Sequence, residues 1–321
     1  MRFDWRGGDL EFRTLSALGR LYAESGQFTQ ALARLRDAAT YFPGHPGALA
    51  VTEKIGEIFA ALFLDGAAAA MPPVAALALF NEYRELTPPG VKGERMVFAL
   101  AERLMAADLL DQAGTLLDHQ VRFRLAGGER ARAGAVLAEV RLAQGRADEA
   151  LAALRTSAAP ALASHLVDRR LRLEARALLD VGNTVKARAL LIGDQSEEAE
   201  ALRAEIAWRA LDWPAAAAAY SRLIKLAPAG APLDRLLAYR VLRRAVALGM
   251  AGQRGDLRAH VAEWGNPMAK TSYGDEFAAV AEGIGGDERN YRSLTENLGA
   301  VTALRRSIGS TGAAGEQTAL R

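Results

Sequence analysis

The chain has 321 residues, of which 50% are hydrophobic and 24% charged, with a formal net charge of +2 and no cysteine. This composition is typical of a folded protein rather than a disordered one. The small net charge argues against a nucleic-acid-binding surface. Without cysteine the chain cannot form disulfides, thiolate metal sites or a thiol nucleophile.

Apolar stretches are too short in this sequence to predict a membrane span. The longest, at 58–64 and 67–80, are interrupted by Asp65, Gly66 and two prolines, and the start MRFDWRGGDLEF is too charged for a signal peptide. If the chain is complete, we expect it in the cytoplasm; a fragment of a longer exported or membrane-anchored protein would not carry that expectation. The alanine-rich composition, with Arg favoured over Lys, suggests a bacterial source.

Residues 10–43 predict the first pair of helices. Apolar residues recur at helical spacing in two runs, Leu15, Leu18, Leu21, Tyr22 and then Phe28, Ala31, Leu32, Leu35, Ala38. Gly26 suits the end of the first helix, where a left-handed residue is often needed. Pro43 closes the second helix.

The spacing of this pair recurs along the chain. Small residue Gly19 is followed by Ala31 twelve positions on and by Leu35 four positions further. The residues corresponding to Gly19 are Gly56, Ala101, Ala138, Ala175, Ala204 and Ala245, with intervals of 37, 45, 37, 37, 29 and 41 residues. The longer second interval indicates an insert near 65–73. Because a helix pair cannot bury its apolar face alone, such units are expected to stack into a solenoid.

This pattern resembles the tetratricopeptide repeat over roughly residues 10–265, most closely in the first unit with its Gly19, Tyr22, Phe28 and Pro43. The resemblance implies an all-α fold, a right-handed superhelix of helical hairpins whose first helices line a concave groove that binds peptides or proteins. The longer period, the insert, and Arg141 at a usually aromatic position depart from the family pattern.

The predicted domain organisation has three parts. Residues 1–265 form an array of about seven helix pairs, residues 266–308 two capping helices after a break at NPMAKTSYGDEF, and residues 309–321 a disordered tail. The capping helices are expected to cover the apolar end of the array.

Signatures of catalysis or metal binding are missing from the sequence. The four histidines, His45, His119, His165 and His260, include no pair at the spacing of a helical zinc site. The glycine-rich stretches match neither a phosphate-binding nor a dinucleotide-binding loop. The segment after the array is too short for a globular catalytic domain. We therefore predict no enzyme activity, no cofactor and no metal.

Arginines form a stripe on one predicted helix. His165, Arg169, Arg172 and Arg176 share one face, and Arg95 and Arg132 occupy matching positions in preceding units. On the groove side, these arginines would bind an acidic peptide or a carboxylate. The alternative is that they pair with acids of neighbouring helices, for which the candidates are Glu102, Glu139, Glu198 and Glu205.

Large apolar side chains are predicted on the same groove side, namely Phe98, Met105, Trp208 and Tyr239. Exposed aromatic residues in a groove are good partner anchors. The alternative is that some of them pack against the next helix. Trp213 and Trp264 are predicted to belong to the core.

These features predict a non-catalytic scaffold or adaptor whose groove binds a partner protein or peptide, with acidic groups as the favoured partner chemistry. The alternative is a structural module that self-associates or joins a larger assembly, which an exposed apolar ladder at one end of the array would favour. Light scattering separates the two, because a monodisperse monomer would count against self-assembly. An RNA-binding helical repeat is disfavoured, since the groove positions alternate in sign.

Overall fold

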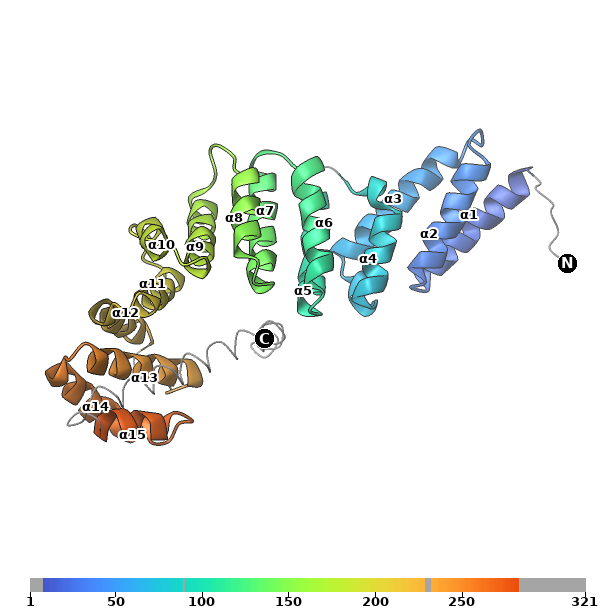
Figure 1. Ribbon diagram of the computed structural model, residues 1–321. Helices are drawn as coiled ribbons and strands as arrows, with labels where there is room; N and C mark the ends of the chain where they lie inside the picture. Colours follow the sequence, from blue (N-terminus) through green and yellow to red (C-terminus); the bar gives the residue numbers. More distant parts are fainter. Residues whose placement is uncertain (1–7, 89, 229–231, 283–321) are drawn as a thin grey trace. The chain divides into compact units, whose positions relative to one another are not determined.

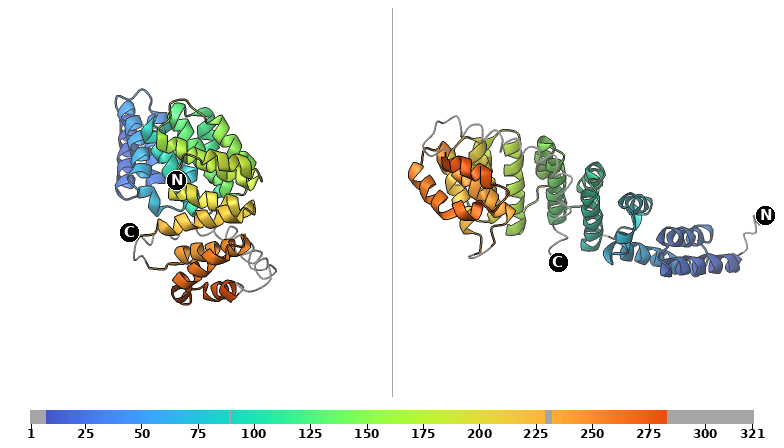
Figure 2. Two further views of the ribbon diagram at one scale, coloured as in Figure 1. Left: turned by 90° about the vertical axis from the view of Figure 1, so that its left-hand side faces the viewer. Right: turned by 90° about the horizontal axis from the view of Figure 1, so that it is seen from below.

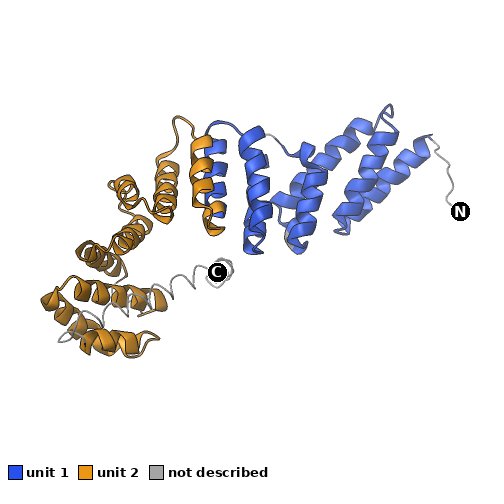
Figure 3. Cartoon of the chain, in the orientation of Figure 1, with its two compact units in different colours: residues 1–140 blue, residues 141–321 orange. Residues whose placement is uncertain are grey.

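A computed structural model describes residues 8–88, 90–228 and 232–282 of the chain, and every regular element in these ranges is helical. The all-α prediction is therefore confirmed. The chain divides into two compact units, residues 1–140 (unit 1) and 141–321 (unit 2) (Figure 3). The second predicted capping helix and the predicted tail lie outside the described residues.

Unit 1 is built from successive helix pairs that lie side by side in each view (Figures 1 and 2). Its elements are α1 (Gly8–Glu24), α2 (Phe28–Tyr41), α3 (Ala48–Leu64), η1 (Ala67–Ala70), α4 (Pro73–Glu82), η2 (Arg84–Leu86), α5 (Val91–Ala106), α6 (Leu110–Phe123) and the larger part of α7 (Gly127–Ala143). Helix α2 packs on α1 and α3, and α5 packs on α3, α4 and α6. The boundary between the two units falls within α7.

Unit 2 continues the same construction. Its helices are α8 (Ala147–Thr156), α9 (Ser164–Asp180), α10 (Thr184–Leu190), α11 (Glu197–Arg209), α12 (Trp213–Lys225), α13 (Arg235–Met250), α14 (Arg254–Met268) and α15 (Gly274–Glu282). Each of these helices packs on the next from α8 to α15, and α9 also touches α11 while α13 touches α15. One apolar core runs through α11 to α15, and a smaller one joins α9, α10 and α11.

The spacing predicted from Gly19 is visible in the burial of the helices. The anchor positions Gly19, Ala101, Ala138, Ala175, Ala204 and Ala245 are buried. So are the positions twelve residues on, which are Ala31, Ala113, Ala150, Ala187, Ala216 and Leu257. At Gly19 the two helices come so close that an added Cβ would lie 2.5 Å from Leu35 Cγ. Small residues at both positions therefore let the paired helices touch along their backbones.

Six of the pairs are joined by one and the same turn. The residue seven positions after the anchor has a positive φ, and the next amide donates to the carbonyl five residues back, as Gln27 does to Tyr22 at 2.8 Å. This is the Schellman arrangement that satisfies the last carbonyls of a helix. The six left-handed residues are Gly26, Asp108, Gly145, Gly182, Leu211 and Gly252. The prediction of a left-handed Gly26 is confirmed, and the turn marks the repeat even where glycine is missing.

Leu211 is the least favourable residue in this set of turns, because a Cβ disfavours its φ of 56° by about 1 kcal/mol. Its side chain is 66% exposed, so little packing is lost on truncation. We expect Leu211→Gly to stabilise unit 2 by roughly 0.5 kcal/mol, the gain being reduced by the greater freedom of glycine in the unfolded chain. Urea denaturation measures the change. The control Gly182→Ala should lose about 1 kcal/mol, and a loss of stability in Leu211→Gly would contradict the strain argument.

The second helix pair, α3 and α4, lacks the common turn. Its connection lies where the insert was predicted. After α3 the chain passes through Gly66, with φ of 82°, into η1, and a proline pair then starts α4. Arg103 of α5 donates to the carbonyl of Met71 at 2.5 Å and holds this connection in place. The rings of Phe59 and Phe63 on α3 and of Phe80 on α4 pack with centroids 5.2 to 5.9 Å apart.

The break predicted after residue 265 begins later than expected. Helix α14 continues to Met268 with Pro267 inside its last turn, and α15 starts at Gly274. The three-part domain division and the right-handed superhelix stay predictions. In the described part of the chain, no helix is both long and apolar enough to cross a bilayer.

Candidate partner-binding surfaces

The arginine stripe predicted on α9 is largely bound by acids of unit 2 itself. Arg172 donates to Asp194 at 2.6 Å and to the Ser196 hydroxyl at 3.3 Å. Arg176 lies 3.5 Å from Asp180, one helical turn on. Burial raises the pKa of the Asp194 carboxyl, but hydrogen bonds from Ser196 and Arg172 outweigh this effect and leave the pKa below its ordinary value. Arg169, on the same helix, is half-buried.

Of the three site residues predicted in unit 1, Arg132 forms an ion pair and Arg95 is exposed to solvent. Arg132 of α7 lies 3.0 Å from Glu94 of α5, whose carboxylate is buried. Burial raises the pKa of Glu94 above its ordinary value, against the pull of Arg132. Arg95 is exposed and Phe98 half-buried on α5.

The acids that pair with Arg132, Arg172 and Arg176 differ from those predicted. They are Glu94, Asp194 and Asp180, none of which is among the four expected glutamates. Of those four, Glu205 pairs with Arg209 at 3.1 Å. Asp194 lies in the loop before α11, where the periodicity of helix faces predicts no contact. For Arg132, Arg172 and Arg176 the alternative of intramolecular pairing is thus confirmed, with other acids than the four expected.

Trp208 is a core residue rather than an exposed anchor. It is 9% exposed and packs edge-on against Trp213 and Tyr220. The guanidinium carbon of Arg243 lies 3.4 Å from the Trp208 ring centroid, and Arg243 Nε donates to Tyr220 Oη at 3.0 Å. Tyr239 is half-buried beside the same guanidinium. The structure therefore corrects the expectation for Trp208, because these rings enclose a buried cation.

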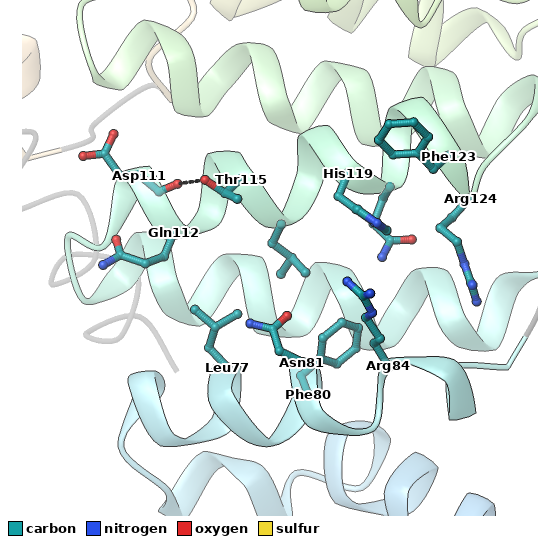
Figure 4. Close-up of a pocket in the computed structure, with 12 residues that line it drawn as sticks. Leu77, Phe80, Asn81, Arg84, Asp111, Gln112, Thr115, His119, Phe123 and Arg124 are labelled. Atoms are coloured by element: carbon teal, nitrogen blue, oxygen red, sulfur yellow. Dashed lines mark hydrogen bonds between the residues drawn. The ribbon is translucent and has the colours of Figure 1, made fainter.

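The structure reveals a pocket that the sequence did not predict. It lies in unit 1 between α4 with its extension η2 and α6, and has a volume of about 620 Å³ (Figure 4). Phe80 and Leu116 are buried in its lining and Leu77 is half-buried. Polar side chains from both helices complete the lining, namely Asn81, Arg84, Asp111, Gln112, Thr115, His119, Gln120 and Arg124. The pocket size is that of a typical ligand site.

This pocket forms because α4 and α6 both pack on α5. They are the second helices of consecutive pairs, whereas the family resemblance directs attention to the first helices. A signal was present in the sequence, since Thr115, His119 and Phe123 follow one face of α6 at intervals of four residues. The rings of His119 and Phe123 lie 5.3 Å apart, and Phe123 is 73% exposed.

Acidic and histidine side chains do not gather into a metal-binding group of three or more within the described ranges. The single histidine of the pocket, His119, contacts an aromatic ring rather than a hydroxyl. The polar groups of the pocket thus offer hydrogen bonds and charge to a ligand, without a nucleophile held by a base.

The helix pairs, their buried small anchors and their common turn define a helical-repeat protein of tetratricopeptide-like construction. No family model matches the chain, and no curated protein is significantly similar to it. Among solved structures, the chain is similar to a tetratricopeptide repeat protein from Parabacteroides merdae ATCC 43184. The identity is 13%, with 89% of this chain and 98% of the other covered, and the TM-score is 0.30.

Proposed function

We propose that the chain is a non-catalytic scaffold that binds a segment of a partner protein, with the pocket between α4 and α6 as a principal site. The observation that carries this proposal is the pocket itself. It combines an apolar lining from Phe80 and Leu116 with a polar and cationic rim. Such a combination gives a partner side chain both buried area and orientation.

Seven of the eight residues predicted from the sequence remain proposed partner contacts, as one set in unit 1 and another in unit 2, whereas Trp208 is buried in the core. In the unit 1 set, Arg95 on α5 is exposed, and Phe98 lies one helical turn away from it. Arg172 and Arg176 are less suitable for a binding test, because reversing their charge would also break the contacts with Asp194 and Asp180. Loss of binding in those variants would not separate recognition from stability.

Affinity purification from the native host, read by mass spectrometry, tests the pocket. The pocket variant carries Arg84→Glu, Phe123→Ala and Arg124→Glu, all at exposed positions. We expect it to recover the specific partner at least tenfold less than the wild type does, since charge and apolar area are both removed. The control Arg20→Glu with Lys92→Glu reverses two exposed charges of unit 1 outside the pocket. Equal recovery by the pocket variant and the wild type would contradict the proposal.

The assembly alternative has one structural observation in its favour. Leu10, Leu18 and Leu21 are exposed on α1, of which only Phe12 and Gly19 are buried. Exposed apolar side chains on one helix are typical of an interaction surface. Light scattering tests this alternative, because a monodisperse monomer would contradict self-association.

A further inference from the structure

We infer that the pocket between α4 and α6 also binds a small molecule, an adenine nucleotide whose base meets the Gln120 amide and whose phosphate meets Arg84 and Arg124. The pocket volume of about 620 Å³ lies within the range of pockets that hold small molecules. This inference goes beyond the proposed function and does not rest on it, because a nucleotide can be titrated without any partner protein.

Gln120 is the residue of the pocket that points most directly to a ligand. It lines the pocket and is only 7% exposed, yet its side-chain amide forms no hydrogen bond with any residue that the structure describes. Buried amides in proteins nearly always have hydrogen-bond partners. Gln120 thus presents an acceptor and two donors that a molecule in the pocket can satisfy.

Both walls of the pocket change from apolar to cationic along their length. On α6, Leu116, Gln120 and Arg124 follow one another at intervals of four residues. On the opposite wall, Phe80 of α4 is followed four residues later by Arg84 of η2, and the two arginines lie at the same end of the pocket (Figure 4). Four residues of helix rise about 6 Å, which is comparable with the separation of base and phosphate in a nucleotide. The order of side chains therefore suits a ligand with a flat ring at one end and an anion at the other.

The cationic end of the pocket suits a single phosphate group. Arg84 and Arg124 are exposed, and among the described residues neither forms an ion pair with a carboxylate, whereas Arg122 nearby is paired with Asp118 at 2.8 Å. Guanidinium groups bind phosphate oxygens through parallel hydrogen bonds. No further arginine or lysine of the described chain lines the pocket, so repeated phosphates of a nucleic acid would find no second cationic site there.

Adenine suits the middle of the pocket because of its edge and its flat face. A glutamine amide can donate to N7 of adenine and accept from its N6 amino group at the same time. Bases also stack on aromatic side chains. The rings of His119 and Phe123 lie 5.3 Å apart on α6 on either side of Gln120 in the sequence, and Phe80 is buried in the lining of the pocket. A simple anion would leave both the amide and the rings without a contact.

Isothermal titration calorimetry of the full chain with adenosine monophosphate tests this chemistry. We expect saturable binding at one site per chain. Adenosine, which lacks the phosphate, and ribose phosphate, which lacks the base, should each bind at least about tenfold more weakly, since each loses one of the two recognised groups. A short adenylate single strand should gain no more than about fivefold over the mononucleotide. Absence of binding, equal binding of ribose phosphate, or a larger gain for the single strand would overturn the inference.

Protein variants then locate the site. The pair Arg84→Ala with Arg124→Ala should weaken adenosine monophosphate at least about tenfold and leave adenosine within about twofold. Gln120→Met, which nearly keeps the size of the side chain without its amide, should weaken both ligands about fivefold. The control pair Arg20→Ala with Lys92→Ala, at exposed positions of unit 1 outside the pocket, should bind like the wild type. Unchanged affinity in the pocket substitutions would overturn the inference.

The stability of Gln120→Met separates a ligand contact from a structural role. Because the Gln120 amide has no hydrogen-bond partner among the described residues, the free variant should melt at a temperature no lower than that of the wild type. Thermal denaturation followed by circular dichroism measures this. A clearly lower melting temperature would show that Gln120 serves the fold and would contradict its assignment to the ligand.

Failure of this inference can be told apart from failure of the proposed function. If adenosine monophosphate does not bind but the pocket variant still loses its partner in affinity purification, the nucleotide chemistry is wrong and the partner site stands. If the nucleotide binds and partner recovery is unchanged, the nucleotide site stands and the partner proposal is wrong. If both hold, nucleotide and partner compete for the same space.

Discussion

Acidification from pH 6.5 to about 4 is expected to destabilise unit 2 by about 3 kcal/mol through one residue, His260. This side chain is 1% exposed within the core of α13, α14 and α15. Its Nε2 lies 3.0 Å from the Val241 carbonyl and its Nδ1 lies 3.0 Å from Arg244 Nη1. Since a carbonyl only accepts and a guanidinium only donates, His260 is neutral, with its proton on Nε2.

Charging His260 would place a second cation against Arg244 in a buried site. Burial is the largest effect and lowers the pKa of His260 to about 4; the hydrogen bond to Val241 raises it, and the charge of Arg244 lowers it further. The unfolded chain has the ordinary value of about 6.5 and takes up the proton first. The stabilisation is therefore complete above pH 6.5 and is lost as the pH falls toward 4.

Urea denaturation at pH 7, 6, 5 and 4 measures this loss, with hydrogen exchange of α13 and α14 assigning it to unit 2. The reference variant is His260→Gln, which has no titrating ring. It should be less stable at pH 7 and should show a flatter pH dependence, so that the difference between the two proteins shrinks on acidification. Carboxylates such as Asp194 contribute equally to both proteins. Parallel pH profiles would contradict the assignment to His260.

Gly19→Ala and Gly56→Ala are expected to change stability in opposite directions, although the two glycines occupy equivalent positions in the first two helix pairs. At Gly19 a new Cβ would lie 2.5 Å from Leu35 Cγ and 3.3 Å from the Ala31 carbonyl oxygen. Overpacking of this kind costs about 1 to 3 kcal/mol, so we expect a net loss of about 2 kcal/mol.

At Gly56, inside α3, the added Cβ would have no atom within 4 Å apart from its chain neighbours and the backbone of its own helix. There the change should gain close to 1 kcal/mol, because alanine is the better helix former. Thermal denaturation of both single variants measures the two effects, and their midpoints should lie on opposite sides of the wild type. If both midpoints shift in the same direction, the close approach of α1 and α2 does not restrict the size of the side chain at position 19.

The spacing of small residues predicted the helix pairs well, because burial leaves little freedom at the points where two backbones meet. The turn at Leu211 could not be predicted in the same way. Its left-handed backbone is imposed by packing of α11 and α12 on either side, against the local preference of leucine. The end of α14 was misplaced for a similar reason, since Pro267 is tolerated in its last turn.

Arginine contacts were the least predictable part. Arg170 donates to the Leu154 carbonyl at 2.5 Å, and Arg209 donates to the Leu179 carbonyl at 3.3 Å. In both cases a long side chain satisfies a carbonyl near the end of a preceding helix. An arginine in a sequence indicates a positive charge, which predicts a carboxylate partner. Which backbone carbonyls its long side chain can contact depends on the packing of the helices.

The pocket was missed because it depends on the distance between α4 and α6, which no periodicity encodes. Helix α4 is preceded by the insert and followed by η2, and neither follows the period of the other units. The residues that line the pocket were visible in the sequence as a polar and aromatic face of α6. That face alone does not define a pocket, because Arg84 and Phe80 on the opposite side come from another helix pair.

The pattern of helix contacts has a consequence for how the protein is made. Within each unit, the principal contacts join helices that are adjacent or next but one along the chain. Such a topology has low contact order and folds quickly, since no distant segment has to be found. A helix pair such as α1 and α2 can close as soon as its second helix leaves the ribosome, and each later pair then has a finished surface to fold against. Folding can thus keep pace with synthesis.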